Sequence, residues 1–142
     1  MFTMNRRLAI LTVSAFWFPV VVEAGDREIR IGMIGLDSSH ATAFTRILND
    51  PEHADHLPGG RVVAGFKAFS PDIEQSVSRV DGYVEELSEK WGVKMYPTIE
   101  AMCREVDAVM VESLDGRPHK RQALAAIAEF AQRSQGIFVR GD

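Results

Sequence analysis

The chain has 142 residues, which is enough for one domain with a hydrophobic core and too few for two. Hydrophobic residues make up 46% and charged residues 25%, the usual range for a globular domain. The net charge of −4 argues against a nucleic-acid partner, and the single cysteine, Cys103, excludes an internal disulfide.

The N-terminal segment has the pattern of an export signal. Arg6 and Arg7 precede an almost wholly apolar run over residues 8–22, and Val22-Glu23-Ala24 offers the small residues of a cleavage site. We therefore expect residues 1–24 to be a signal peptide that exports the protein to the periplasm or another extracytoplasmic space. An uncleaved membrane anchor is the alternative, and the paired arginines leave a twin-arginine export route open.

From residue 25 onward, short apolar runs alternate with longer amphipathic stretches, which predicts βαβ units. The expected strands are residues 29–34, 61–66, 93–96, 108–112 and 137–139. The expected helices are residues 41–48, 84–91 and 118–133, with a short helix after an N-cap at Thr98 that buries Ile99, Met102 and Cys103. This order is typical of an α/β fold, a doubly wound parallel sheet of the Rossmann type, in a single domain of residues 25–142.

Ligands of doubly wound sheets bind beyond the carboxyl ends of the strands, so three loops are expected at the site: residues 36–40, 67–72 and 113–119. The first loop is the most informative. An apolar strand ends at Gly35, a short polar turn follows, and a helix begins. This is the geometry that brings a helix N-terminus against a phosphate group.

The glycine pattern of that turn is incomplete. The dinucleotide fingerprint G-x-G-x-x-G has Gly35 at its first position, but Asp37 and His40 at the second and third. A carboxylate at the second position repels a pyrophosphate unless it turns away to cap the helix. The hydroxyls of Ser38 and Ser39 and the free N–H groups of the helix can still hold an anion. The alternative is that Asp37 or Ser38 only caps the helix.

The second strand lacks the acidic residue that usually holds the ribose hydroxyls. It ends Gly65-Phe66-Lys67, and Asp72 follows several residues later. Lys67 favours a 2′-phosphate in one interpretation and is a solvated strand-end lysine in the other. The sequence therefore leaves the choice between NAD and NADP open.

The third loop joins an acid, a hydroxyl, a glycine turn, an arginine and a histidine at a strand-to-helix corner, residues 112–119. His119 either contacts a ligand or caps the loop, and Arg117 either meets an anionic group or is solvated. By contrast, His53, Asp55 and His56 lie in a loop away from the predicted ligand edge. We expect that loop to be solvated and assign no metal site to it.

The motifs G-L-D-S-S-H at residues 35–40 and D-G-R-P-H at residues 115–119, with the order of the segments between residues 29 and 139, resemble the Gfo/Idh/MocA oxidoreductases. The resemblance implies an N-terminal Rossmann domain that binds NAD or NADP, followed by a substrate domain. It implies hydride transfer between the nicotinamide and a sugar, cyclitol or related alcohol. By matching position, the pyrophosphate turn is Gly35, Asp37, Ser38, Ser39 and His40, and the nicotinamide side is Ser113, Leu114, Asp115 and His119.

The sequence departs from this family at its C-terminal end. The family has a lysine beside the nicotinamide, whereas Gly141 occupies the matching position, and the substrate domain is missing from the sequence. We therefore assign no catalytic residue and expect an incomplete oxidoreductase that is not catalytic alone. The alternative is a non-catalytic module that binds another ligand in the same crevice, or a partner subunit, including a homo-oligomer, through its unpaired sheet edge. A degenerate fragment without function is the third possibility.

Overall fold

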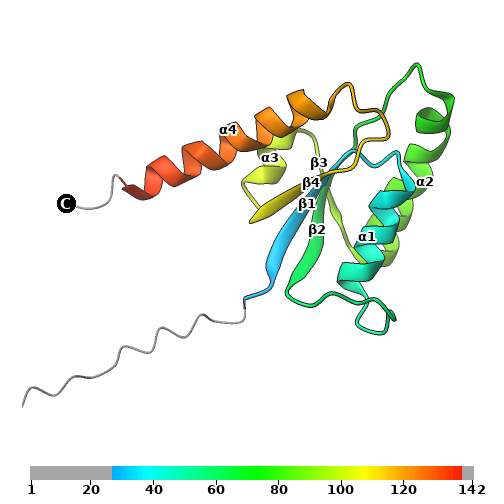
Figure 1. Cartoon of the computed structure of the whole chain (residues 1–142), viewed down its shortest axis with the longest axis horizontal. Coiled ribbons are helices and arrows are strands. Elements are labelled where there is room, and N and C mark those ends of the chain that lie inside the picture. Colours follow the sequence, from blue (N-terminus) through cyan, green and yellow to red (C-terminus); the bar gives the residue numbers. More distant parts are fainter. Residues whose placement is uncertain (1–26, 139–142) are drawn as a thin grey trace, which may run out of the picture.

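A computed structural model of the chain describes residues 27–138, and in this part strands and helices alternate along the sequence (Figure 1). The elements are β1 (Ile29–Ile34), α1 (Ser39–Asn49), β2 (Gly60–Phe66), α2 (Glu74–Trp91), β3 (Lys94–Tyr96), α3 (Ile99–Cys103), β4 (Ala108–Val111) and α4 (His119–Phe138). The predicted signal peptide, residues 1–24, and Gly141 lie outside the described residues. Within residues 27–138, no helix combines the length and the apolar character that crossing a membrane requires.

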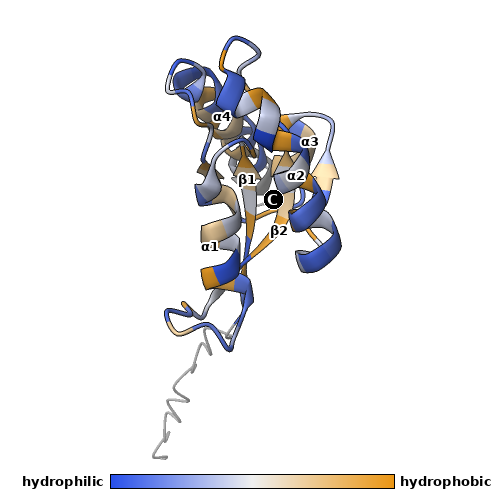
Figure 2. Ribbon diagram, turned by 90° about the vertical axis from the view of Figure 1, so that its right-hand side faces the viewer, coloured by the Kyte–Doolittle hydropathy of each residue, from blue (hydrophilic) through white to orange (hydrophobic). Residues whose placement is uncertain are grey.

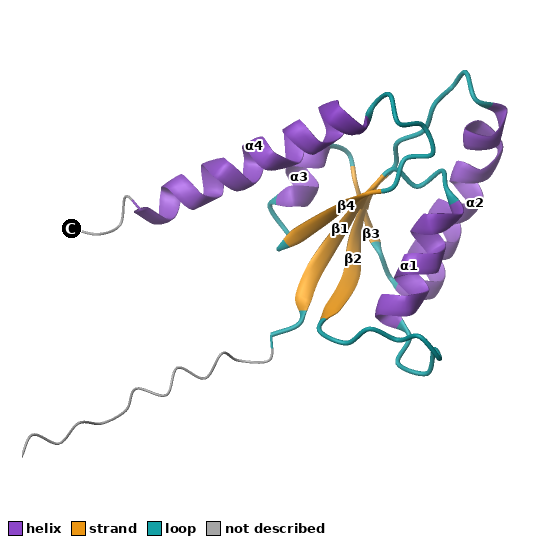
Figure 3. Ribbon diagram, viewed as in Figure 1, coloured by secondary structure: helices purple, strands orange, loops and turns teal. Residues whose placement is uncertain are grey.

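The strands form one parallel sheet in the order β3-β2-β1-β4 (Figure 3). The chain builds the sheet outward from β1 to β2 and β3, then returns to place β4 on the other side of β1. The strand order therefore reverses between β1 and β4, and this topological switch point is where doubly wound sheets bind ligands. The predicted α/β class and parallel Rossmann-like sheet are confirmed.

Helices cover both faces of the sheet (Figure 1). Successive side chains of a strand point to opposite faces, so Met33 packs with Leu87 of α2 on one face, whereas Ile34 packs with Met102 of α3 on the other. Ala126 of α4 joins the second cluster. Figure 2 shows hydrophobic residues along β1 and β2 and hydrophilic residues over much of the outer helical surface. Two buried clusters, one on each face, thus fix the helices to the sheet.

Local chemistry fixes several element boundaries. Gly92 ends α2 in the left-handed conformation with φ of 66°, which glycine adopts without strain. Thr98 caps α3 by accepting a hydrogen bond from the Ala101 N–H at 3.1 Å, as its sequence position predicts. The side chain of Asn49 bonds both the N–H and the C=O of Val62 at 2.8 Å, which ties the end of α1 to β2.

One predicted strand and the predicted start of one helix are wrong. α4 continues through Ile137 and Phe138, so the strand predicted at residues 137–139 does not form there, and Val139 lies outside the described residues. Each residue added to an existing helix gains one backbone hydrogen bond, so a short apolar run at a helix end does not by itself start a strand. α2 begins at Glu74, well before the predicted residue 84, because Ser76, Val80 and Leu87 form its buried side.

Asp107 joins the start of β4 to β1. Its carboxylate accepts hydrogen bonds from the Arg30 backbone N–H at 3.0 Å and from Arg30 Nε at 3.1 Å, and Arg27 Nη2 lies 3.3 Å away. The bonds from Arg30 lower the pKa of Asp107 from 3.8 to about 2. The ionised carboxylate is therefore the form that the folded protein stabilises.

We expect Asp107→Asn to lower the free energy of unfolding by about 1 kcal/mol at neutral pH, a modest value because this carboxylate is partly exposed. The folded pKa of Asp107 lies below its unfolded pKa. The difference in free energy of unfolding between the native chain and the variant is therefore complete above pH 3.8 and is lost as the pH falls toward 2. Urea unfolding at neutral pH and near pH 2.5 measures this, with Asp55→Asn in an exposed loop as the control. A difference that does not change with pH would contradict the assignment.

Candidate functional site

The three loops predicted at the ligand edge meet in the structure. The Gly35 N–H donates to the Phe66 carbonyl at 3.1 Å, and the Leu36 N–H donates to the Ala68 carbonyl at 3.3 Å, which joins the loop after β1 to the loop after β2. The Glu112 N–H donates to the Ile34 carbonyl at 2.7 Å, which brings the loop after β4 to the same edge. The sheet thus gathers the β1–α1, β2–α2 and β4–α4 loops around its switch point.

Gly35 allows the closest approach between two of these loops. Its φ is 85°, in the region that favours glycine. A Cβ built at this position would overlap the backbone and the side chain of Ser113. The first fingerprint glycine is therefore required by contact between the β1–α1 and β4–α4 loops within the protein.

Asp37 is fully buried and connects all three loops. One carboxylate oxygen accepts a hydrogen bond from Ser76 Oγ at 2.5 Å, and the other accepts one from the Leu114 N–H at 2.9 Å. Ser76 Oγ in turn accepts from the Ser70 N–H at 2.7 Å. The carboxylate turns away from the ligand edge, as a pyrophosphate there would require. It does not cap α1 but bonds α2 and the β4–α4 loop.

The first turn of α1 has no side-chain cap. Ser38 occupies the N-cap position, but its hydroxyl donates to the Glu112 carbonyl at 2.8 Å and makes no capping hydrogen bond. The interpretation in which Asp37 or Ser38 caps this helix is therefore wrong. Ser39 and His40 are exposed, and in residues 27–138 their backbone N–H groups have no acceptor. The N-terminus of an 11-residue helix thus presents unsatisfied donors and its positive dipole end at the switch point.

Ser113 and His119 are engaged within the β4–α4 loop. The Ser113 hydroxyl and the Gln122 side-chain amide bond each other, with distances of 2.8 and 3.1 Å. The Ser113 carbonyl lies 2.7 Å from His119 Nε2, so this ring nitrogen carries the donated proton. Of the two predicted roles for His119, the structure shows the bond that fixes the loop. Leu114 is exposed beside them.

Arg117 lies between two carboxylates and links the third loop to the second. Its Nη2 donates to both oxygens of Asp72, at 2.9 and 2.7 Å, and its Nε donates to Asp115 at 2.6 Å. Asp115 also accepts from Ser70 Oγ at 2.9 Å. Hydrogen bonds from the Arg117 backbone, Ser70 and the guanidinium lower the pKa of Asp115. Arg117 is thus an exposed arginine whose donors are held by two carboxylates of the protein.

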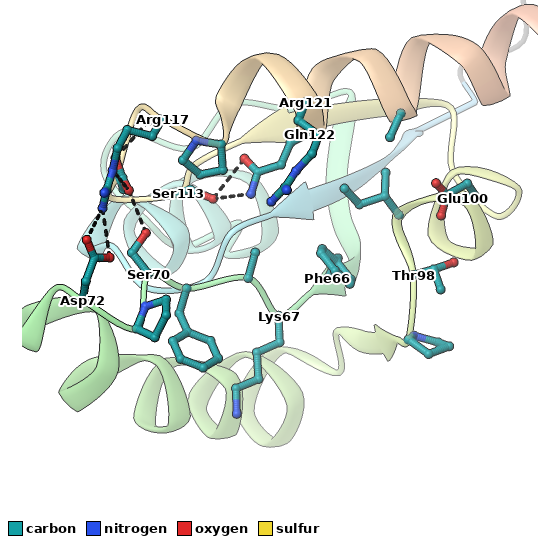
Figure 4. A pocket seen from close by; sticks show the side chains of 18 residues that line it. Phe66, Lys67, Ser70, Asp72, Thr98, Glu100, Ser113, Arg117, Arg121 and Gln122 are labelled. Carbon is teal, nitrogen blue, oxygen red and sulfur yellow. Dashed lines mark hydrogen bonds and ion pairs between the residues drawn. The ribbon is translucent and has the colours of Figure 1, made fainter.

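A cavity of about 800 Å³ lies between the β2–α2 loop, the start of α3 and the first turns of α4 (Figure 4). Its apolar wall includes Phe66, Phe69 and Ile99, and its charged residues include Lys67 and Arg121. The volume is that of a typical small-molecule site. The sequence interpretation missed Arg121, although it follows Pro118 by three residues, which places the two on one helix face.

A smaller cavity of about 240 Å³ lies between the N-terminus of α1 and the β4–α4 loop. Its wall includes His40, Glu112 and His119. His40 Nδ1 lies 3.7 Å from the Glu112 carboxylate. Burial raises the pKa of Glu112, and the charges of His40 and His119 act in the opposite direction. Ser113 lines both cavities, so the two share this residue.

The loop after α1 makes local contacts. The Asp55 N–H donates to His53 Nδ1 at 3.1 Å, and His56 Nδ1 lies 3.0 Å from the Ile47 carbonyl. The loop leads into the amino end of β2, the edge opposite to the switch point. Across residues 27–138, no group of three or more His, Cys, Asp or Glu side chains is placed to hold a metal ion.

The predicted residues thus fall into two sets. Gly35, Asp37, Ser38, Ser113 and Asp115 build and fix the edge through bonds or close contacts within the protein, whereas Ser39, His40 and Leu114 are exposed there. His119 does both, because it bonds Ser113 and lines the smaller cavity. Comparison of the chain with protein-family models and with curated proteins gives no match.

Proposed function

We propose that this chain binds NAD or NADP across the carboxyl edge of its sheet, as the nucleotide-binding domain of an oxidoreductase of the Gfo/Idh/MocA type. The substrate class that goes with this proposal is a sugar, a cyclitol or a related alcohol. The observation that carries the proposal is the uncapped first turn of α1 at the switch point between β1 and β4. The first N–H groups of a helix have no acceptor within the helix, and an anion is a partner that the helix dipole favours.

The residues present fit a pyrophosphate at this position. Asp37 directs its charge inward, where Ser76 and Leu114 bond it, so the carboxylate does not occupy the mouth of the turn. The exposed hydroxyl of Ser39 adds a donor to the backbone N–H groups. The larger cavity would receive the adenosine half of the dinucleotide and the smaller one the nicotinamide half. When bound, the nicotinamide would supply or accept the hydride, and this chain would hold and orient it.

The charge at the N-terminus of α1 provides the test. We expect Ser39→Glu to weaken binding of NADH and NADPH about tenfold or more, because it places a negative charge beside the pyrophosphate. Ser39→Gln, of similar size and uncharged, is the matched control and should change the affinity less than about threefold. Isothermal titration calorimetry of the full chain measures both affinities.

The stability of the same variants separates this effect from misfolding. An acidic residue in the first turn favours the helix dipole by about 0.3–1 kcal/mol, so Ser39→Glu should unfold no more easily than the native chain. Equal affinity in Ser39→Glu and Ser39→Gln would place the dinucleotide elsewhere. No saturable binding by a chain that unfolds cooperatively would overturn the proposal and favour a module for a different ligand.

A further inference from the structure

The side of α4 that points away from the sheet is apolar. Leu124 and Ile127 expose 54% and 61% of their surface. Ala128 and Ala131 are exposed as well, and all four residues follow the spacing that places side chains on one face of a helix. Ala126, on the opposite face, is buried in the core. The four exposed residues together form the outward α4 face.

No charge interrupts this face. Between Arg121 and Arg133 the only charged residue is Glu129, which is buried and accepts a hydrogen bond from Arg104 at 3.0 Å. By contrast, exposed charged residues occur along the whole of α2. Figure 1 shows α4 along the outside of the molecule, with its outer side not covered by another element of the described chain. A helix that is apolar on its outer face as well as its inner one is typical of a helix that is covered on both sides.

The order of large and small residues on the outward α4 face fits a second copy of the same face. When two α4 helices pack antiparallel about a two-fold axis beside Ile127 and Ala128, Leu124 of each copy lies against Ala131 of the other. These two positions pair because they are equally far from the axis in opposite directions along the helix. A large side chain against a small one lets the two helices interdigitate at close approach.

The charges of α4 suit the same arrangement. Antiparallel packing brings Lys120, which is exposed one turn before Leu124, beside the last turns of α4 in the second copy. The C-terminal end of a helix is the negative end of its dipole, so a cation is favourable there. The two copies of Lys120 lie at opposite ends of the contact, about 22 Å apart along the helix axis, and salt screens their repulsion.

We propose that this chain forms a two-fold homodimer through its outward α4 face. One helix face packed on another buries less than the roughly 1,200 Å² of a standard interface, so the dimer is weak, with a dissociation constant of about 10–300 μM. The side of α4 that lines the larger cavity, with Gln122 and Ala125, lies outside this interface. The carboxyl edge of each sheet therefore stays open, and the inference does not rest on the proposed function.

Sedimentation equilibrium of the full chain from about 5 to 500 μM measures the association. Ile127→Glu should weaken it about tenfold or more, because dimerisation would then bury an unpaired carboxylate. Val77→Glu changes a 44% exposed apolar residue on α2 and is the matched control, with a dissociation constant within about twofold of the native value. Both positions are exposed, so urea unfolding of the dilute variants should match that of the native chain.

Two further variants test the packing itself. Ala131→Leu makes the outward α4 face more apolar but fills the space for Leu124 of the other copy, so it should weaken the dimer about fivefold. Ala128→Cys should form a disulfide across the two-fold axis on mild oxidation. Ala131→Cys should not, because its two copies lie about 10 Å apart along the helix axis. The native chain, whose Cys103 is buried, is the control for oxidation.

The outcomes decide between specific and unspecific contact. A native chain that stays monomeric throughout, or association that Ile127→Glu leaves unchanged, would overturn the proposal. Stronger association in Ala131→Leu would overturn it too, since the face would then be an unspecific apolar patch, and so would equal cross-linking of Ala128→Cys and Ala131→Cys. Ile127→Glu should bind NADH and NADPH as the native chain does, so failure of the dimer and failure of dinucleotide binding are separate results.

Discussion

Gly35→Ala is expected to lower the free energy of unfolding by about 3 kcal/mol or more, the largest effect predicted for a single methyl group in this chain. Two costs add at this position. The backbone φ of 85° lies in the left-handed region, which costs an L-residue about 1–2 kcal/mol. The added Cβ would also overlap the backbone N and Cα of Ser113, so no change of rotamer relieves the contact.

Gly59→Ala is the matched control for Gly35→Ala. Gly59 also has a positive φ, 96°, but a Cβ built there meets nothing within 4 Å. It should therefore cost only the conformational part, about 1 kcal/mol. Urea unfolding of the native chain and both variants measures the difference. Equal losses in the two variants would show that the overlap with Ser113 is relieved by a small movement of the loop.

Asp37→Ala is expected to cost about 3 kcal/mol, because it leaves partners of the carboxylate buried and unsatisfied. The Ser76 hydroxyl, in the first turn of α2, and the Leu114 N–H, in the β4–α4 loop, both lose their acceptor. The loss should appear in urea unfolding at neutral pH. It should also loosen the carboxyl edge, seen as faster amide hydrogen exchange at Leu114.

A double-mutant cycle with Ser76→Ala separates the carboxylate's network from simple loss of packing. Ser76→Ala alone should cost about 1–2 kcal/mol. If the two side chains act as one unit, the double variant should cost less than the sum of the single variants by about 1 kcal/mol. Asp72→Ala, whose carboxylate is exposed and bonded by Arg117, is the control with a loss below about 1 kcal/mol. Strict additivity of Asp37 and Ser76 would contradict the network.

The sequence determined the class of fold and the edge of the sheet at which the three loops meet. Apolar runs of strand length alternating with helical periodicity predict a parallel α/β sheet, because burial on two faces demands that pattern. Parallel strands place their carboxyl ends at one edge, so the loops after β1, β2 and β4 could be assigned to one site before any coordinates. The sequence did not determine every boundary. The first turns of α2, from Glu74, are mostly polar, so their few buried positions do not show a helical period. Ile137 was expected to start a strand after α4, but it belongs to α4.

Only the tertiary structure decided what each polar side chain at that edge does. An aspartate or serine suits a ligand contact as well as a contact with another loop, so residue type does not distinguish the two roles. The partners of Asp37, Ser38 and Asp115 are Ser76, Glu112 and Ser70, which are distant in the sequence. Local rules such as capping depend on neighbours along the chain, whereas these bonds depend on which loops the sheet brings together. The sequence therefore located the edge, and the packing of three loops determined which of its donors remain for a ligand.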